Sequence, residues 1–543
     1  MKKFALTMSA TVLSATMILA GCGSSNPSNT ASNAGGNSAK SGGKTLIFGR
    51  GGDTVTLDPA NATDGETFRV TDNIYETLVA DKPGTFDVKP GLATDWSASK
   101  NGLKWTFHLR KNVKFQDGTP FNADAVVFNF NRWMDPQNPY HKGDFEYFTN
   151  MFGGFKGNPK AVIKDVKKLD DYTVEIDLAH PSAPFLADLT MAAFSIASPA
   201  DVKKYNGDIK DHPIGTGPFK FVSWKPNDSI TLEKNPSYWD TGKPKLDKIV
   251  FQVIKDNKAR LNALQAGQID IMDGLNPADV PTVKNDSNLQ LFTRPSNNVG
   301  YLAFNTQKKP FNDPRVRQAI NMVVDKKALI DAFYNGMAVP AVSVLPPSMW
   351  GNDTSLQDYQ VNIQKAKQLL AEAGYPNGFK TDLWAMPVAR PYMPQPEKIA
   401  AALQADMKKI GIDAKIVTYD WATYLKKTAN GEHTMALLGW TGDNGDPDDF
   451  LYVLLDQDNA NPPAQNIAFY KNPEVHKLLV QAQQETDQNK RADLYKKAEQ
   501  IILKDAPWVP LVHSTPPMAA SKKVTGFVPS PVGSDILTNV DIK

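Results

Sequence analysis

Alternating apolar and polar residues mark the clearest strands of this chain. Residues 103–109 alternate Leu, Trp, Phe and Leu with polar neighbours, directly after the turn formed by Asn101 and Gly102. Residues 172–178 repeat the pattern with Tyr, Val, Ile and Leu. A period of two residues is typical of a half-buried strand. The first half of the chain therefore contains a sheet-rich section.

A second pattern predicts an α/β layer. Residues 249–254 form an apolar-rich strand of the kind found in parallel sheets. A helix over 257–266 follows, ended by Gly267, and then a short strand over 269–272. This β–α–β order is typical of an α/β layer. Further strands are expected over 45–48, 220–224, 229–233, 382–386, 414–419, 435–440 and 508–513.

Helical spacing of apolar residues predicts the remaining helices. Phe68, Ile74 and Leu78 give such spacing over 67–78, and a helix after Asn122 or Asp124 has a residue suited to cap it. Other helices are expected from Pro314 onward, over 365–373, over 399–410, and in two pieces over about 472–503.

Length and composition indicate a soluble protein with several domains. A chain of 543 residues is long for a single core and suggests two or three domains. Its 41% hydrophobic and 22% charged residues are ordinary for a globular protein. The net charge of +2 gives no support to nucleic-acid binding.

The N-terminus reads as an export signal. Lys2 and Lys3 precede a short apolar stretch over 4–20, too rich in Ser and Thr for a membrane span. The stretch ends in LAGC at 19–22, which resembles the bacterial lipobox, so we expect a lipoprotein signal peptide over 1–22 and a lipidated Cys22. Residues 23–43 are almost wholly small and polar, and predict a flexible tether.

Cys22 is the only cysteine, so no internal disulfide can form in the exported protein. We therefore expect its thiol to anchor the protein on the outer face of the cell membrane.

Catalytic and metal-binding motifs are missing from the sequence. None of the seven histidines is paired at metal-ligand spacing, and H-E-x-x-H, G-x-S-x-G and Walker-type patterns do not occur. Asp443, Asp446, Asp448 and Asp449 suggest calcium, but their order does not match an EF-hand and Pro447 interrupts it. We expect a binding protein rather than an enzyme, without a cofactor or a bound metal.

The segment 439–450 carries the most suggestive chemistry. A strand ends at Trp440, and a loop with four aspartates follows. Trp440 beside Asp443 is a plausible seat for an ammonium group, because an aromatic wall and an acid both favour a cation. The alternative is a solvated turn with a core tryptophan.

Arg390 matches Asp443, because it too follows a predicted strand end. In open α/β sheets, ligands bind beyond the carboxyl ends of strands. A guanidinium grips a carboxylate with two hydrogen bonds. Together the two residues would suit a zwitterion whose charges are about 7 Å apart, as in two extended residues. The alternative is that they pair with each other or with unrelated neighbours.

Five longer motifs resemble the extracellular solute-binding proteins of family 5, the peptide- and nickel-binding components of ABC importers. Three mark the family: LKWTFHLR with FQDG at 103–118, GTGPF at 215–219, and DPRVRQA at 313–319. Two resemble its dipeptide branch: LWAMPVARPY at 383–392 and GWTGDNGDPD at 439–448. The resemblance covers about residues 44–543.

The resemblance implies a periplasmic-binding-protein type II fold: α/β, with two main lobes, an extra domain and a hinge-closing clamp. Domain I would comprise 44–76, 213–300 and 512–543, domain II (the extra domain) 77–212, and domain III 301–511. Asp443 should hold a peptide's ammonium and Arg390 its carboxylate. The residues expected to line the peptide between them are Trp440, Thr441, Gly442, Tyr392 and Thr63.

The resemblance also implies partners. We expect a monomer that hands dipeptides, or tripeptides, to an ABC permease with a cytoplasmic ATPase. The separation of Arg390 and Asp443 along the chain is the one the dipeptide branch shows, and it favours a short ligand. Receptors for nickel or a metallophore, haem, aminolevulinate or glutathione remain alternatives, as does a cell-surface hydrolase that uses the acidic loop. Side-chain preference is left open.

Overall fold

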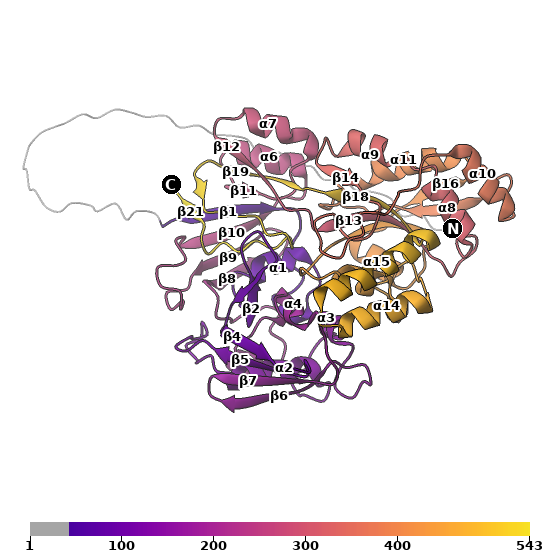
Figure 1. Ribbon diagram of the computed structural model, residues 1–543. Helices are drawn as coiled ribbons and strands as arrows, with labels where there is room; N and C mark the ends of the chain where they lie inside the picture. Colours follow the sequence, from indigo (N-terminus) through magenta and orange to yellow (C-terminus); the bar gives the residue numbers. More distant parts are fainter. Residues whose placement is uncertain (1–42) are drawn as a thin grey trace, which may run out of the picture. The chain divides into compact units, whose positions relative to one another are not determined.

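The computed structural model describes residues 43–543. The predicted signal peptide over 1–22, Cys22 and all but the last residue of the tether over 23–43 lie outside the described residues. Two large sheets and a smaller one organise the described part (Figure 1). Among residues 43–543, no helix has the length and apolar character needed to cross a membrane.

The first large sheet has seven strands and combines distant parts of the chain. β1 lies between β10 and β11 and is parallel to both, with α6 connecting them, so the predicted β–α–β unit is confirmed. The strand order is β12 (Leu289–Thr293), β19 (Pro517–Ser521), β11 (Ile271–Met272), β1 (Thr45–Arg50), β10 (Lys248–Val253), β9 (Ser229–Lys234) and β8 (Phe219–Lys225).

The second large sheet has six strands, both parallel and antiparallel. β15 is parallel both to β16 and to β17, whereas β13 is antiparallel to β17 and β18. The order is β14 (Ala338–Pro340), β18 (Trp508–Ser514), β13 (Asn298–Phe304), β17 (Met435–Thr441), β15 (Lys380–Trp384) and β16 (Asp413–Val417).

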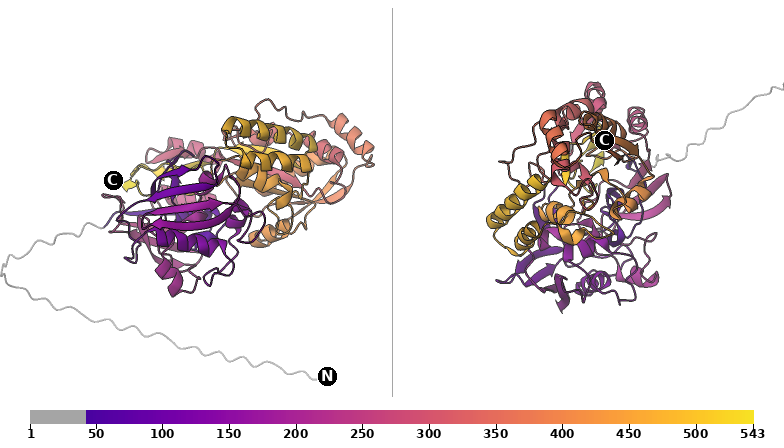
Figure 2. Two further views of the ribbon diagram at one scale, coloured as in Figure 1. Left: turned by 60° about the horizontal axis from the view of Figure 1, so that its bottom comes forward. Right: turned by 90° about the vertical axis from the view of Figure 1, so that its right-hand side faces the viewer.

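The smaller sheet holds the alternating strands of the sequence. Its order is β4 (Ala93–Ala98), β5 (Lys104–Leu109), β7 (Thr173–Leu178) and β6 (Ile163–Asp170), all antiparallel. α2 (Ala123–Met134) packs against β6 and β7, and Asn122 caps it as predicted. Figure 2 shows this sheet in purple. Two hairpin-like pairs complete the strands: β2 (Val79–Asp81) with β3 (Val88–Pro90), and β20 (Val524–Thr525) with β21 (Asp541–Ile542).

Helices cover these sheets and connect their strands. Those nearest the site are α1 (Gly65–Thr71), α3 (Glu146–Phe152), α4 (Phe185–Asp188), α11 (Pro396–Lys408), α12 (Trp421–Ala429), α13 (Asp448–Leu455), α14 (Pro473–Gln484) and α15 (Gln488–Asp505). The others are α5 (Pro199–Lys204), α6 (Asn257–Gln265), α7 (Val280–Asn285), α8 (Pro314–Asn321), α9 (Lys326–Phe333) and α10 (Ile363–Glu372).

Two short crossings join the large sheets. Residues 294–297 run from β12 to β13, and residues 515–516 run from β18 to β19. The strands on each side of the crossings pair with each other, β12 with β19 and β13 with β18. The Arg294 amide donates to the Pro516 carbonyl at 2.9 Å between the crossings. Few residues therefore have to rotate when one sheet moves relative to the other.

The three sheets fall into the three predicted domains only approximately. The smaller sheet lies wholly within 77–212, and the seven-stranded sheet uses strands from the three segments assigned to domain I. In the six-stranded sheet, β13 begins before residue 301 and β18 continues past residue 511. The domain boundaries stay a prediction.

One predicted helix is confirmed only in its first five residues. The helix expected over 67–78 ends at Thr71, although Phe68, Ile74 and Leu78 are all buried as expected. Neighbouring segments use the backbone that would continue it: the Ile74 carbonyl accepts from Gly217 N–H and from the Gln116 amide, both at 2.9 Å. Tertiary hydrogen bonds thus replace helical ones.

Candidate functional site

Arg390 and Asp443 follow the ends of neighbouring parallel strands. β15 ends at Trp384 and β17 at Thr441, and the two strands pair in parallel through Trp384 and Ala436. Because parallel strands point their carboxyl ends to the same edge of a sheet, the loops carrying Arg390 and Asp443 leave from one edge. The placement expected from the sequence is therefore present in the topology.

Asp443 is a half-buried carboxylate held by a distant tyrosine. The Tyr147 hydroxyl, from α3, donates to Asp443 Oδ2 at 2.5 Å. Burial raises the pKa of Asp443 to about 7, against the lowering effect of the tyrosine hydrogen bond. No lysine or arginine pairs with Asp443 among residues 43–543. A ligand cation would supply the missing charge.

Asp449 positions the backbone of Asp443. Its Oδ2 accepts from the Asp443 amide at 2.8 Å and from the Trp440 indole nitrogen at 3.4 Å. Burial and the charge of Asp443 raise the pKa of Asp449 well above its usual range. Trp440 is half-buried and packs against the largest hydrophobic cluster, so its ring serves partly as core.

Arg390 faces a tryptophan and an aspartate instead of Asp443. Its guanidinium carbon lies 4.6 Å from the centre of the Trp421 ring, at the start of α12. Its charge also lowers the pKa of Asp64, which burial raises. Arg390 forms no ion pair with a residue in the described part of the chain, so its fork of donors is free to meet a carboxylate.

Thr63 shares the Arg390 side of the site. It is exposed and directly precedes Asp64, whose carboxylate caps α1 by accepting from the Thr67 amide at 3.0 Å. Because Asp64 feels the charge of Arg390, the loop before α1 faces the loop after β15. This loop comes from the seven-stranded half of the protein, so the site has walls from both large sheets.

The three other predicted lining residues differ in burial and in the neighbours that they contact. Thr441 ends β17 and is half-buried. The Gly442 amide donates to the Asn297 carbonyl at 2.8 Å, and its carbonyl accepts from the Asn297 side-chain amide at 2.9 Å. A Cβ at Gly442 would lie 2.5 Å from the Phe450 ring. Tyr392 is only 7% exposed, and its ring packs on Gly439. Gly442 and Tyr392 thus shape the wall that Thr441 and Trp440 present.

The other loop aspartates have structural roles. Asp448 and Asp449 begin α13. Asp446 accepts two hydrogen bonds at 2.8 Å from the buried Arg491 guanidinium of α15, and its Oδ1 also accepts from the Asp448 amide at 3.0 Å. A rigid bidentate pair therefore fixes the loop just after Asp443.

Sequence reasoning also missed Tyr147, Asp64 and Trp421. Tyr147 and Trp421 are far from the motifs along the chain, and nothing in their local sequence marks them. Asp64 carried a signal, since Asp before a helical segment is a common N-cap, but not one that pointed to Arg390.

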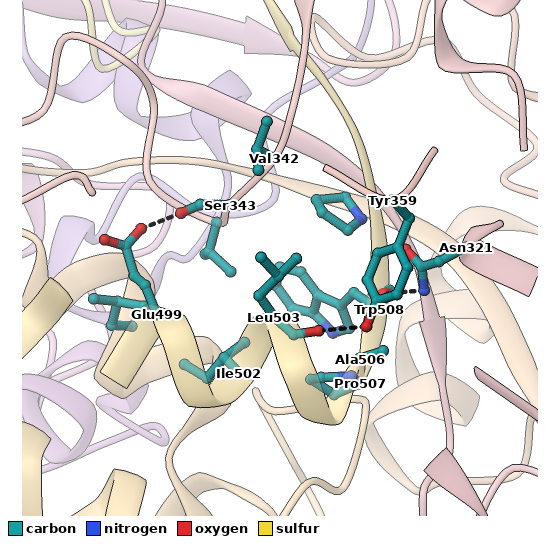
Figure 3. A pocket seen from close by; sticks show the side chains of 13 residues that line it. Asn321, Val342, Ser343, Tyr359, Glu499, Ile502, Leu503, Ala506, Pro507 and Trp508 are labelled. Atoms are coloured by element: carbon teal, nitrogen blue, oxygen red, sulfur yellow. Dashed lines mark hydrogen bonds between the residues drawn. The ribbon is translucent and has the colours of Figure 1, made fainter. Parts of the chain in front are cut away.

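Two other features are poor candidates for a ligand site. A cavity between α15 and β18 measures about 20 Å³, room for one water, and contains the buried Glu499 beside Ser343 (Figure 3). Among residues 43–543, the one group with metal-ligand spacing is Asp456, Asp458 and His476. This group follows the end of α13, whereas Asp443 precedes its start, and the helix between them is about 12 Å long.

Comparisons with known proteins agree on one family. The model of the bacterial extracellular solute-binding proteins, family 5, matches residues 87–462. The chain is 42% identical over 515 residues to a dipeptide-binding protein of Escherichia coli, covering 92% of this chain and 95% of that protein. It is 41% identical over 547 residues to haem-binding protein A of Haemophilus influenzae, covering 98% of each.

A solved structure shares the fold. An ABC-transporter-associated periplasmic binding protein of Helicobacter pylori, in complex with the peptide STSA, superposes with a TM-score of 0.84 at 39% identity. The match covers 92% of this chain and 98% of that one.

Proposed function

This chain belongs to the bacterial extracellular solute-binding proteins of family 5, and from that premise we propose that it captures dipeptides and tripeptides by their charged ends. It is a substrate-binding protein of an ABC importer with the clamp fold of periplasmic binding proteins, as the sequence predicted. Its activity is binding and delivery to a permease, with no chemical reaction assigned to it.

The observation that carries the proposal is the pair of uncompensated charges at one sheet edge. Neither Asp443 nor Arg390 forms an ion pair within residues 43–543, although Asp443 is half-buried. An unpaired charge out of water is costly, and a zwitterion would relieve both costs. The ammonium would bind Asp443 beside Trp440, and the carboxylate would bind Arg390 near Thr63.

Closure around the peptide would use the two crossings at 294–297 and 515–516. The Arg390 and Asp443 loops belong to the six-stranded half, and Thr63 and Asp64 to the seven-stranded half. A ligand touching both halves stabilises the closed form by its extra contacts. Tyr147 adds a contact from the smaller-sheet section to Asp443 itself.

Calorimetry with Ala-Ala, its N-acetylated form and its C-terminal amide tests this assignment. Ala-Ala should bind, and each blocked form should bind at least a hundredfold more weakly, because each removes one charge. Equal affinity for all three would contradict recognition by termini.

Haem is the second candidate, because one relative at 41% identity is named a haem-binding protein. Titration with haemin, followed by its absorbance, would show a saturable shift if haem binds. Competition by Ala-Ala would place haem in the same site, and no shift would dismiss this candidate.

We further propose that the protein is a monomer held on the outer face of the membrane by lipid on Cys22. The support is the lipobox-like LAGC at 19–22 and the lack of any other cysteine. Labelled palmitate should be incorporated into the wild type and not into Cys22→Ser, which should also leave the membrane fraction. Unchanged fractionation of Cys22→Ser would contradict the anchor.

A further inference from the structure

A cavity of about 250 Å³ has Asp443 in its lining. Asp443 is part of its lining, but Arg390, Tyr392, Trp440 and Thr441 are not. The cavity is therefore a separate compartment that meets the proposed peptide site at the ammonium end.

The lining of this cavity combines an aromatic ring near Asp443 with further acids. Phe68 lines it, and the Phe68 ring packs against Tyr147, which holds Asp443. Asp72 lies one helical turn beyond Phe68, and Asp81 ends β2. Both carboxyls line the cavity, and the charge of Asp81 contributes to a raised pKa of Asp72. The cavity thus offers an apolar surface near Asp443 and two further acids.

The cavity has a surplus of negative groups. Its lining contains five carboxylic acids and three lysines. Lys82 and Lys243 pair at the rim with Asp87 at 3.3 Å and Asp240 at 2.9 Å. Lys89 is the remaining cation, and its charge acts on Asp81 while burial lowers its own pKa. It cannot neutralise both Asp72 and Asp81.

The other lining acid is already satisfied. Glu76 accepts hydrogen bonds from the side chains of Thr216, Tyr238 and Trp239, at 2.8 to 3.1 Å. Asp72 and Asp81 accept fewer hydrogen bonds than Glu76. Asp81 accepts from Thr190 at 3.4 Å, and the Ser534 hydroxyl is the neighbour that lowers the pKa of Asp72. Asp72 and Asp81 are therefore the acids left for a ligand.

We propose that this cavity receives the cationic side chain of the peptide's first residue, lysine or arginine, with its charged head between Asp72 and Asp81. Such side chains have an apolar stem and a charged end, which matches a cavity lined by Phe68 and by the acids Asp72 and Asp81. The inference rests on the proposed function, because the ammonium must sit at Asp443 for the side chain to enter. It assigns the receptor a preference for basic first residues.

Calorimetry with Lys-Ala and norleucine-Ala tests the proposal, because norleucine keeps the stem and lacks the charge. Wild type should bind Lys-Ala at least tenfold more tightly. Asp72→Asn and Asp81→Asn should each remove that preference and leave norleucine-Ala binding unchanged, which also shows that the variants fold. Asp87→Asn, an exposed change on the same hairpin, should keep the preference.

Proton release supplies a second readout. Burial raises the pKa of Asp72 and of Asp81 to about 7, so both are partly protonated near neutral pH. Lys-Ala should therefore release more protons than norleucine-Ala, measured from binding heats in buffers of different ionisation enthalpy. Equal release would contradict a cation beside these acids.

Failure of this inference is distinguishable from failure of the proposed function. If norleucine-Ala binds and needs Asp443, while Lys-Ala gains nothing from Asp72 and Asp81, the cavity assignment alone is overturned. If norleucine-Ala binds equally well to Asp443→Asn, the proposed function is overturned as well.

Discussion

The Tyr147 hydroxyl donates to Asp443 Oδ2 at 2.5 Å, although the two residues lie far apart along the chain and belong to different sheets' surroundings. The contact joins α3, next to the smaller sheet, to the loop after β17. It leaves Asp443 Oδ1 as the oxygen for a ligand ammonium. Tyr147 is thus a positioning residue for the carboxylate on which the account depends.

Tyr147→Phe should weaken dipeptide binding by about 1.5–3 kcal/mol, the value of a hydrogen bond to a charged group. Because this hydrogen bond lowers the pKa of Asp443, its loss should also move the pH midpoint of binding upward. Calorimetry across pH measures both effects. A weaker affinity with an unmoved midpoint would indicate that Tyr147 acts only through packing.

Dipeptide affinity should rise with pH up to about 7 and fall above about 8. The ammonium binds the ionised form of Asp443, whose pKa burial raises to about 7, so below that pH each unit should cost about tenfold. Above about 8 the peptide's own amine loses its proton. Titrations from pH 5 to 9 measure this profile, and Asp443→Asn should lack the rising limb. A flat wild-type profile would contradict the role of Asp443.

Trp421→Leu should weaken binding by about 0.5–1 kcal/mol, because the indole face holds the Arg390 guanidinium by a cation–π contact. The loss should be largest for peptides with a free carboxylate and absent for their amides, which do not need Arg390. Equal losses for both forms would show that Trp421 acts elsewhere.

Arg491→Ala should destabilise the protein by about 3–5 kcal/mol. The variant would leave Asp446 buried without its bidentate partner, close to the buried Asp448. Urea unfolding followed by tryptophan fluorescence gives the value. Lys490→Ala, an exposed neighbour on α15, is the matched control and should change stability by less than about 0.5 kcal/mol. Similar losses in both variants would contradict the structural role of this pair.

Local patterns were enough for most elements. The alternating residues of β5 and β7 and the glycine-ended α6 and α11 formed where expected, because their own side chains set the periodicity. The helix expected over 67–78 failed where Gln116 and Gly217 take the Ile74 carbonyl. Such contacts depend on chain segments that a local pattern does not contain.

The site residues were predictable where the local sequence marks them, and not where only tertiary folding brings them together. Arg390 and Asp443 were marked by strand ends, motif and charge, and the topology places their loops at one edge. Tyr147, Trp421 and the acid pair Asp72 and Asp81 have no mark in the sequence, because only tertiary folding brings them to the site. Their roles follow from contacts and burial.

Calorimetry of Ala-Ala with wild type, Asp443→Asn and Arg390→Ala tests the central claim most directly. Ala-Ala should bind the wild type, and each variant should lose at least a hundredfold in affinity. Arg390→Ala should no longer distinguish Ala-Ala from its amide. Wild-type affinity in either variant would contradict recognition of a peptide by its two charged ends.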